Sequence, residues 1–146
     1  MALSKTIQLL TKLPDSDANI GNSKPTRKRL LVLDTDHFSE LERKLLPGQR
    51  LAVRLATSGL EKAVTVVTVE EGMRGRVAEI GRHPNPHHQI ISYAKLQRQV
   101  EVLASWLILP LDVESAEMFL NFRRQGIRIG SMDLKIACIV LAHDAT

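Results

Sequence analysis

One short apolar run constrains this chain more than any other feature. Residues 30–33 read LLVL, and the string DTDH follows at once at residues 34–37. An apolar run of this length that ends in acids indicates a buried strand of a parallel sheet. Ligands of open α/β sheets bind just outside the carboxyl ends of the strands. The Asp34 carboxylate is poorly solvated at such a place unless a positive charge compensates it, and a divalent cation is the usual partner.

Length and charge bound the class of protein. The chain has 146 residues, which is enough for one domain with a sizeable core. Residues 1–29 hold six basic and two acidic residues and the remainder holds 14 of each, so the net charge of +4 belongs to the first segment. We expect that segment to be a flexible basic tail, in which Lys24–Arg29 are either solvated or touch phosphates. The folded domain is expected over residues 30–146.

Hydropathy and cysteine content indicate a cytoplasmic protein. No apolar run approaches the length of about 18 residues that a membrane-spanning helix requires. The N-terminus has neither a long apolar stretch nor a clear cleavage site, which argues against a signal peptide. The single cysteine, Cys138, cannot form a disulfide within the chain and lies in an apolar helical run, where we expect a small core residue.

Hydrophobic periodicity predicts strands that alternate with helices. The strands are expected at residues 30–33, 64–69 and 108–111. The helices are expected at residues 38–46, 51–60, 70–82, 89–107, 112–125 and 132–142. Strands separated by helices are typical of an α/β fold, in which helices flank a central parallel sheet.

Three carboxylates occupy equivalent places in this layout. Asp34 follows the first strand, Glu71 is expected in the first turn of the helix after the second strand, and Asp133 is expected in the first turn of the last helix. If the strands are parallel, all three side chains face one cleft. Oxygen ligands of this kind suit Mg²⁺ or Mn²⁺. Without a metal, carboxylates this close would raise one another's pKa.

Several neighbouring residues have two readings each. Asp36 is either a further metal ligand or the cap of the following helix. His37 either contacts a substrate or is exposed or packed. Arg74 and Arg76 either bind phosphates or are exposed helix charges. His83, His87 and His88 flank two prolines without regular spacing, so we expect a surface loop there.

Three stretches together resemble a known family. They read LVLDTDHFSEL at residues 31–41, TVEEGMRGR at 68–76 and IRIGSMDLKIACIVLAHDAT at 127–146. With their spaced acids, they are similar to the PIN domain, and within it to the VapC-type toxins of bacterial toxin–antitoxin pairs. The resemblance extends over residues 30–146. In the second stretch, an acid followed four residues later by glycine favours Glu71 over Glu70.

The resemblance implies a fold, an activity and partners. The implied fold is a PIN-like three-layer sandwich, and the implied activity is a Mg²⁺- or Mn²⁺-dependent ribonuclease. Asp34, Glu71 and Asp133, with Asp36 as a further candidate, would hold the metal. The implied partners are an RNA substrate, a cognate antitoxin and a second copy of the chain, since residues 89–107 carry more apolar positions than a small core needs. Relatives have a further acid-bearing strand after the last helix, and the sequence stops at residue 146, where that strand would begin. We therefore expect the activity of these 146 residues to be impaired.

Two other functions remain open. One is a catalytically degenerate PIN-fold protein that binds an antitoxin or RNA without cleaving it. The other is a haloacid-dehalogenase-like phosphatase, whose signature is an apolar strand followed by Asp-x-Asp. In that chemistry Asp34 would be the nucleophile and Asp36 the general acid. His37 and the surroundings of Asp133 match that family poorly.

Overall fold

The computed structural model of the chain describes residues 30–43 and 45–145. The expectations for the tail at residues 1–29, including Lys24–Arg29, lie outside this part. The elements run in the order β1 (Leu30–Leu33), α2 (Thr35–Arg43), α3 (Leu46–Thr57), β2 (Glu61–Thr65), α4 (Val66–Gly81), α5 (Pro86–Leu103), β3 (Leu107–Leu109), α6 (Val113–Arg124) and α7 (Ser131–Ala142).

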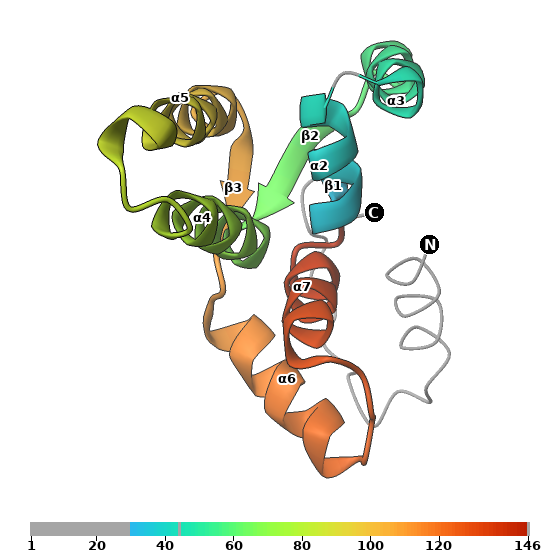
Figure 1. The fold of residues 1–146 in the computed structure, drawn as a ribbon. Coiled ribbons are helices and arrows are strands. Elements are labelled where there is room, and N and C mark those ends of the chain that lie inside the picture. The colour runs from blue at the N-terminus through green and yellow to red at the C-terminus, as the bar shows by residue number, and fades with distance from the viewer. Residues whose placement is uncertain (1–29, 44, 146) are drawn as a thin grey trace.

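The strands form a parallel sheet in the order β1-β2-β3 (Figure 1). Val32 of β1 lies opposite Ala63 of β2, and Val64 lies opposite Ile108 of β3. Because every strand runs the same way, all the carboxyl ends meet at one edge of the sheet. The predicted α/β class with a parallel sheet is confirmed.

Helices cover both faces of the sheet because its side chains alternate. Ala63 packs with Ile136, Ile139 and Val140 of α7 on one face. The next residue, Val64, points the other way and packs with side chains of α2, α3 and α5, namely Phe38, Leu55 and Leu103. This period of two is what a strand buried on both faces requires. A sandwich of the PIN type in particular does not follow from these contacts.

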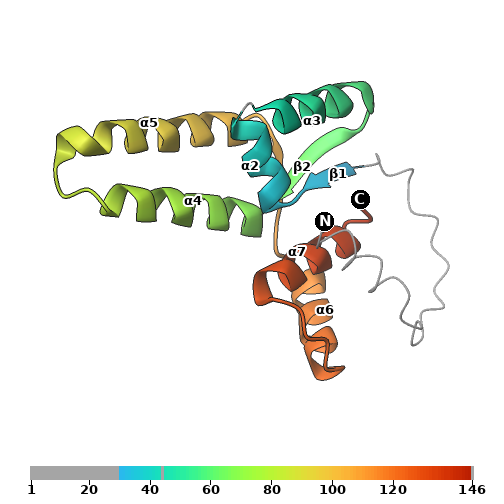
Figure 2. The same ribbon diagram turned by 45° about the vertical axis from the view of Figure 1, so that its right-hand side comes forward.

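Two helix pairs extend from the sheet on different sides (Figure 2). Helices α4 and α5 lie side by side as a hairpin, and α6 packs on α7. Cys138 lies fully buried between α6 and α7, and burial raises the pKa of its thiol to about 11. The core role predicted for this cysteine is confirmed. No helix in the described ranges is long and apolar enough to cross a membrane.

The second strand differs from its prediction. Residues 64–69 were expected to be a strand because they are rich in β-branched residues, but β2 ends at Thr65 and α4 begins at Val66. The Thr65 hydroxyl accepts a hydrogen bond from the Thr68 N–H at 3.0 Å and so caps α4. Such a cap satisfies a backbone N–H in the first turn of the helix, and β-branched composition alone gives no sign of it. Glu71 therefore lies in the second turn of α4 rather than the first.

Helix starts account for the other differences. The helix expected at residues 51–60 begins earlier, at Leu46, and Pro47 lies in its first turn, where the missing N–H of proline has no cost. The loop expected at residues 83–88 is shorter, because the Asn85 side chain accepts from the His87 N–H at 2.9 Å and begins α5. The last helix was expected at residues 132–142, whereas α7 begins one residue earlier, at Ser131, with Gly130 in the cap position. The helix expected at residues 112–125 forms as α6, with Asp112 as its cap.

Candidate functional site

Asp34 lies at the carboxyl end of β1, as predicted. Its Oδ1 accepts a hydrogen bond from the His37 N–H at 2.9 Å and lies 2.6 Å from the His37 Nδ1. Its backbone carbonyl accepts from the Phe38 N–H, which is the first helical bond of α2. Asp34 therefore caps α2, so Asp36 does not have the cap role that was considered for it. The Asp34 side chain is 14% exposed, so little water reaches this carboxylate.

Glu71 is brought to the same edge by a hydrogen bond. The hydroxyl of Thr35, the residue after Asp34, donates to the Glu71 Oε2. This bond joins the start of α2 to the second turn of α4. Two of the three predicted acids thus come from elements that meet beside the sheet, although they are 37 positions apart in the sequence.

Asp133 lies in the first turn of α7, where the sequence predicted it. Its side chain is exposed and folds back over Gly130, because a Cβ placed on that glycine would be 3.2 Å from the Asp133 Oδ2. Within residues 30–43 and 45–145, no three His, Cys, Asp or Glu side chains are close enough to hold a metal ion. A preassembled three-carboxylate site is therefore not present in this part of the chain.

The remaining candidates lie on exposed surfaces. Asp36 is exposed in the first turn of α2. Arg74 forms an ion pair with Glu70 one turn away, which supports the interpretation of Arg74 as an exposed helix charge. His83, His87 and His88 are all exposed, as expected, although His87 and His88 belong to α5.

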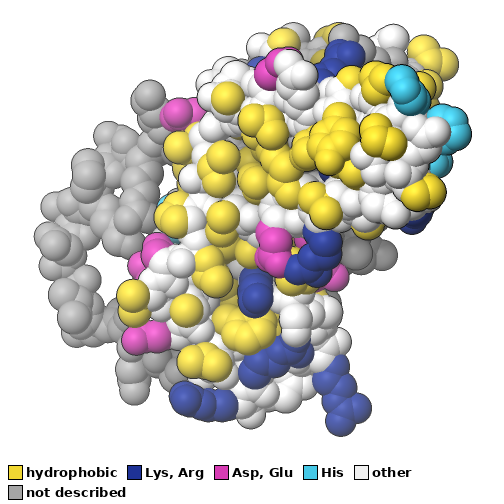
Figure 3. Space-filling view, turned by 60° about the vertical axis from the view of Figure 1, so that its left-hand side comes forward, with side chains coloured by type: hydrophobic (Ala, Val, Ile, Leu, Met, Phe, Trp, Pro, Cys, Tyr) yellow, Lys and Arg dark blue, Asp and Glu magenta, His cyan; other side chains and the backbone are white. Residues whose placement is uncertain are grey.

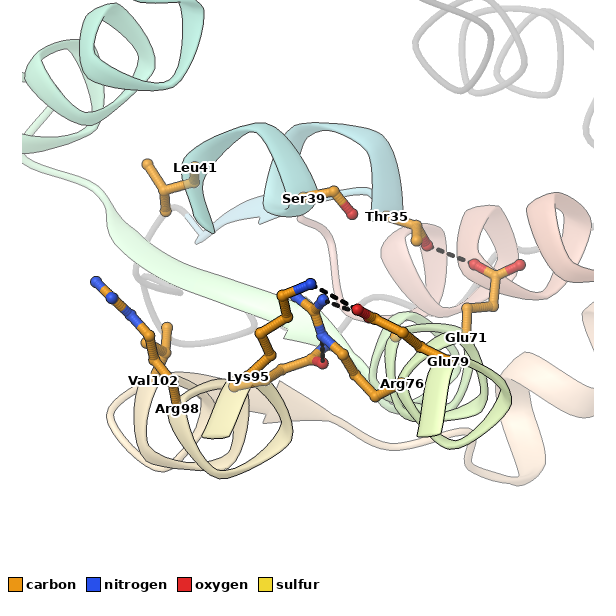
Figure 4. Close-up of a pocket in the computed structure, with 12 residues that line it drawn as sticks. Thr35, Ser39, Leu41, Glu71, Arg76, Glu79, Lys95, Arg98 and Val102 are labelled. Carbon is orange, nitrogen blue, oxygen red and sulfur yellow. Dashed lines mark hydrogen bonds and ion pairs between the residues drawn. The ribbon is translucent and has the colours of Figure 1, made fainter. Parts of the chain in front are cut away.

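A cleft of about 780 Å³ opens between α2 and the α4–α5 hairpin (Figure 4). Thr35 and Glu71 line one part of it, and side chains of α5 line another. The full lining is Thr35, Ser39, Leu41, Glu71, Gly72, Gly75, Arg76, Glu79, Lys95, Arg98, Gln99 and Val102.

Most charges in the cleft are paired. Lys95 Nζ donates to the Glu79 Oε1 at 2.5 Å, and Arg76 Nη1 lies 3.5 Å from the Glu79 Oε2. The hydrogen bond from Lys95, with the positive charges of Lys95 and Arg76, holds the pKa of Glu79 below its usual range. Arg76 Nε also donates to the Oε1 of the buried Gln99 at 3.1 Å. Arg98 is different, because it has no hydrogen bond or ion pair with any residue in the described ranges.

The sequence did not reveal the α5 side of the cleft. Lys95, Arg98 and Gln99 were read only as part of a long helix. The available signal was Gln99, a polar residue on the same helical face as the buried Ser92 and Leu103. A buried amide needs a partner, and its partner here, Arg76, lines the cleft.

Solved structures with a similar fold belong to toxin–antitoxin systems. One is VapBC2 from Rickettsia felis bound to a DNA fragment from their promoter, with a TM-score of 0.56 and 17% identity over 80% of this chain and 83% of that one. Another is FitAcB from Neisseria gonorrhoeae, with a TM-score of 0.55 and 22% identity over the same shares of both chains. No family model matches the chain, and no curated protein matches it either.

These comparisons correct the family assignment made from the sequence. Both solved structures are complexes, and neither name singles out a PIN-type toxin as the part that matches. At these identities the likeness shows the fold alone. Three short acid-bearing stretches are too little sequence to establish membership of a family, and the assignment to the PIN domain and to VapC-type toxins is withdrawn. The chain shares its α/β fold with components of toxin–antitoxin systems.

Proposed function

We propose that this chain is a metal-dependent ribonuclease that works together with a partner protein in a toxin–antitoxin system. The observation that carries the proposal is the meeting of Asp34 and Glu71 beside the carboxyl edge of the parallel sheet, through the Thr35–Glu71 hydrogen bond. This edge is where open α/β sheets bind ligands. The fold likeness to VapBC2 and FitAcB supports the toxin–antitoxin setting and the partner.

The chemistry of the donor set suits a hard divalent cation. Asp34, Glu71 and Asp133 offer only carboxylate oxygens, which Mg²⁺ and Mn²⁺ prefer over nitrogen or sulfur ligands. Mg²⁺ commonly keeps several waters and needs only one or two carboxylates. Asp34 and Glu71 would therefore hold the ion, and Asp133 in the first turn of α7 is the further candidate ligand. When bound, such an ion activates water and neutralises charge on a phosphate.

The side chains around the acids fix their positions. His37 holds the Asp34 carboxylate through its backbone N–H and lies beside it with its ring. Thr35 holds one oxygen of Glu71 and leaves the other oxygen available. Preorganised ligands lose less freedom when an ion or a substrate binds. The cleft between α2 and the hairpin would receive the RNA strand that leads to these acids.

One observation favours a second function, binding without cleavage. The described residues contain no ready-made set of three metal-binding side chains. A protein that only binds RNA or a partner protein does not need such a set.

A cleavage assay separates the two functions. Purified protein is incubated with a fluorescently labelled single-stranded RNA and either Mn²⁺, Mg²⁺ or EDTA. We expect cleavage only with the metals, and we expect Asp34→Asn and Glu71→Gln to lower its rate by at least about 100-fold, the scale of losing a group that acts in the transition state. Glu117→Gln, which removes an exposed carboxylate on α6 away from the cleft, serves as the matched control and should cleave like the wild type.

Two outcomes of this assay would contradict the proposal. If the wild-type protein binds the RNA but leaves it intact with both metals, binding without cleavage becomes the supported function. Cleavage that persists unchanged in both acid variants would show that Asp34 and Glu71 have been assigned wrongly.

A further inference from the structure

Arg98 is the cation of the cleft that the fold itself does not use. Arg76 and Lys95 are both engaged by Glu79, whereas Arg98 has no partner in the described part of the chain. Figure 4 shows its guanidinium group reaching away from α5, apart from the cluster that Arg76, Glu79 and Lys95 form. An exposed guanidinium that lines a cleft and has no anionic partner within residues 30–43 and 45–145 can bind an external anion.

Arg98 also joins the cleft to a second hollow. That hollow has a volume of about 670 Å³ and is lined by Ala94, Gln97, Arg98, Glu101, Val102 and Ser105. Arg98 and Val102 line both spaces, so the two hollows adjoin at these residues. We treat the two adjoining hollows as one path along α5, with Thr35 and Glu71 in the lining of its first part.

We propose that Arg98 binds a backbone phosphate of single-stranded RNA, on the part of the strand that continues from the cleft into the second hollow. The inference rests on the proposed function for the nature of the strand. A guanidinium binds phosphate through two parallel N–H···O bonds, which gives it both affinity and orientation. Arg98 would act as a positioning residue that fixes the register of the strand relative to Glu71.

The shape and charge of this path favour a nucleic acid over an acidic polypeptide. The path contains a cation at its middle and apolar surface from Leu41 and Val102 beside it. Single-stranded RNA presents phosphates at regular intervals with flat bases between them, so one phosphate meets Arg98 while bases rest on apolar atoms. An acidic peptide has carboxylates but no flat bases that could rest on this apolar surface.

The test measures binding apart from cleavage. Full-length protein in EDTA is titrated into a fluorescein-labelled single-stranded RNA oligonucleotide, and anisotropy gives the dissociation constant at several salt concentrations. Arg98→Ala should weaken binding about tenfold, as expected for loss of a hydrogen bond to a charged group. The slope of log affinity against log salt should become shallower by about 0.7, the value for one phosphate contact to a single strand. Arg98→Lys should lie between Arg98→Ala and the wild type, since a point charge replaces a bidentate one.

Arg124→Ala is the matched control, because Arg124 is an exposed arginine at the far end of α6. It should leave both the affinity and the salt slope unchanged. Circular dichroism of each variant checks that the fold is retained, which we expect because Arg98 is exposed and unpaired in the described part of the chain.

Each outcome decides the inference separately from the nuclease proposal. Arg98-dependent RNA binding by a protein that never cleaves RNA would support the inference while the nuclease proposal fails. Unchanged affinity and slope in Arg98→Ala would overturn the inference even if the protein cleaves RNA. Failure of the wild type to bind RNA would overturn it too. The same holds if Arg98→Ala lost binding to labelled polyglutamate but not to RNA, because the occupant would then be an acidic protein segment.

Discussion

Asp34 caps α2, and under the proposed function it would also hold a metal ion. The two roles depend on different properties of its side chain. As the cap of α2 it needs an oxygen that accepts the His37 N–H, and as a metal ligand it needs a negative charge. Asparagine supplies the first property and lacks the second, and it is as good a helix cap as aspartate. Asp34→Asn is therefore the substitution that removes the charge while it keeps the local fold.

Asp112 is the residue at which the pH dependence of stability is predicted most directly. Hydrogen bonds from the Ser115 hydroxyl at 2.6 Å and the Ser115 N–H at 2.8 Å, with the nearby His143, hold the pKa of Asp112 below its usual range. A carboxyl whose pKa is lower in the folded state stabilises the fold above its unfolded pKa. This stabilisation is lost as the pH falls through the folded pKa.

We therefore predict that Asp112→Asn has a lower melting temperature than the wild type near neutral pH and that the difference shrinks toward about pH 3. Asparagine still accepts the bonds from Ser115 but carries no charge that titrates. The measurement is thermal unfolding by circular dichroism at a series of pH values. A difference that stays constant or grows as the pH falls would contradict the role of Asp112.

At the scale of elements, two glycines of α4 give opposite predictions for the same substitution. A Cβ on Gly72 would lie 2.3 Å from the Nε2 of the buried Gln99, whereas a Cβ on Gly75 would meet no atom within 4 Å. Gly75→Ala should raise the free energy of unfolding by about 1 kcal/mol, since alanine is the better helix former. Gly72→Ala must displace the Gln99 amide, and overpacking of this kind costs about 1–3 kcal/mol.

Urea denaturation of the two variants measures this difference. We expect Gly72→Ala to be less stable than Gly75→Ala by at least about 1 kcal/mol. Equal stabilities would show that Gln99 moves aside freely and that α4 and α5 are held less closely than their contacts indicate.

The elements also show how far the sequence predicts the fold. The parallel α/β class and the bounds of β1 follow from hydrophobic pattern, because a short apolar run bounded by acids has few other readings. The boundary between β2 and α4 does not follow from this pattern. Residues 66–69 are all β-branched, which favours a strand, yet they form the first turn of α4. In the structure, the Thr68 N–H donates to the Thr65 hydroxyl and caps the helix that begins there.

The site is predictable to a similar extent. The position of Asp34 follows from the end of β1, and the approach of Glu71 follows from the parallel sheet. The position of Asp133 relative to the other acids depends on how α7 packs against the sheet. The local sequence pattern around Asp133 does not predict this packing. The α5 wall was missed because Lys95 and Arg98 are ordinary helix residues until α2 is placed opposite them.

At the scale of the whole molecule, the exposed apolar surface predicts self-association. Ile90, Tyr93 and Val100 of α5 are 62%, 53% and 48% exposed. They lie on one side of the helix, and Figure 3 shows hydrophobic side chains gathered across one face of the molecule. Large apolar patches of this kind mark interaction surfaces. The homodimer expected from the sequence thus stays a prediction with a defined surface.

Light scattering at high micromolar concentration tests the dimer. We expect the wild type to have the mass of two chains and Val100→Glu to have the mass of one, because an unpaired charge is costly inside an interface. Val53→Glu, at an exposed apolar position on α3, is the control and should remain dimeric. A wild-type protein that is monomeric at these concentrations would exclude this assembly.

The most direct test of the proposed metal site is a Mn²⁺ titration followed by electron paramagnetic resonance, which detects the free ion. We predict that the wild type binds about one Mn²⁺ per chain and that Asp34→Asn and Glu71→Gln each weaken binding at least about tenfold, because a neutral amide is a poor ligand for a hard cation. Asp133→Asn should weaken it as well, whereas Glu117→Gln should not. A wild-type protein that binds no Mn²⁺, or an Asp34→Asn variant that binds it as tightly as the wild type, would contradict a metal site at the carboxyl edge of the sheet.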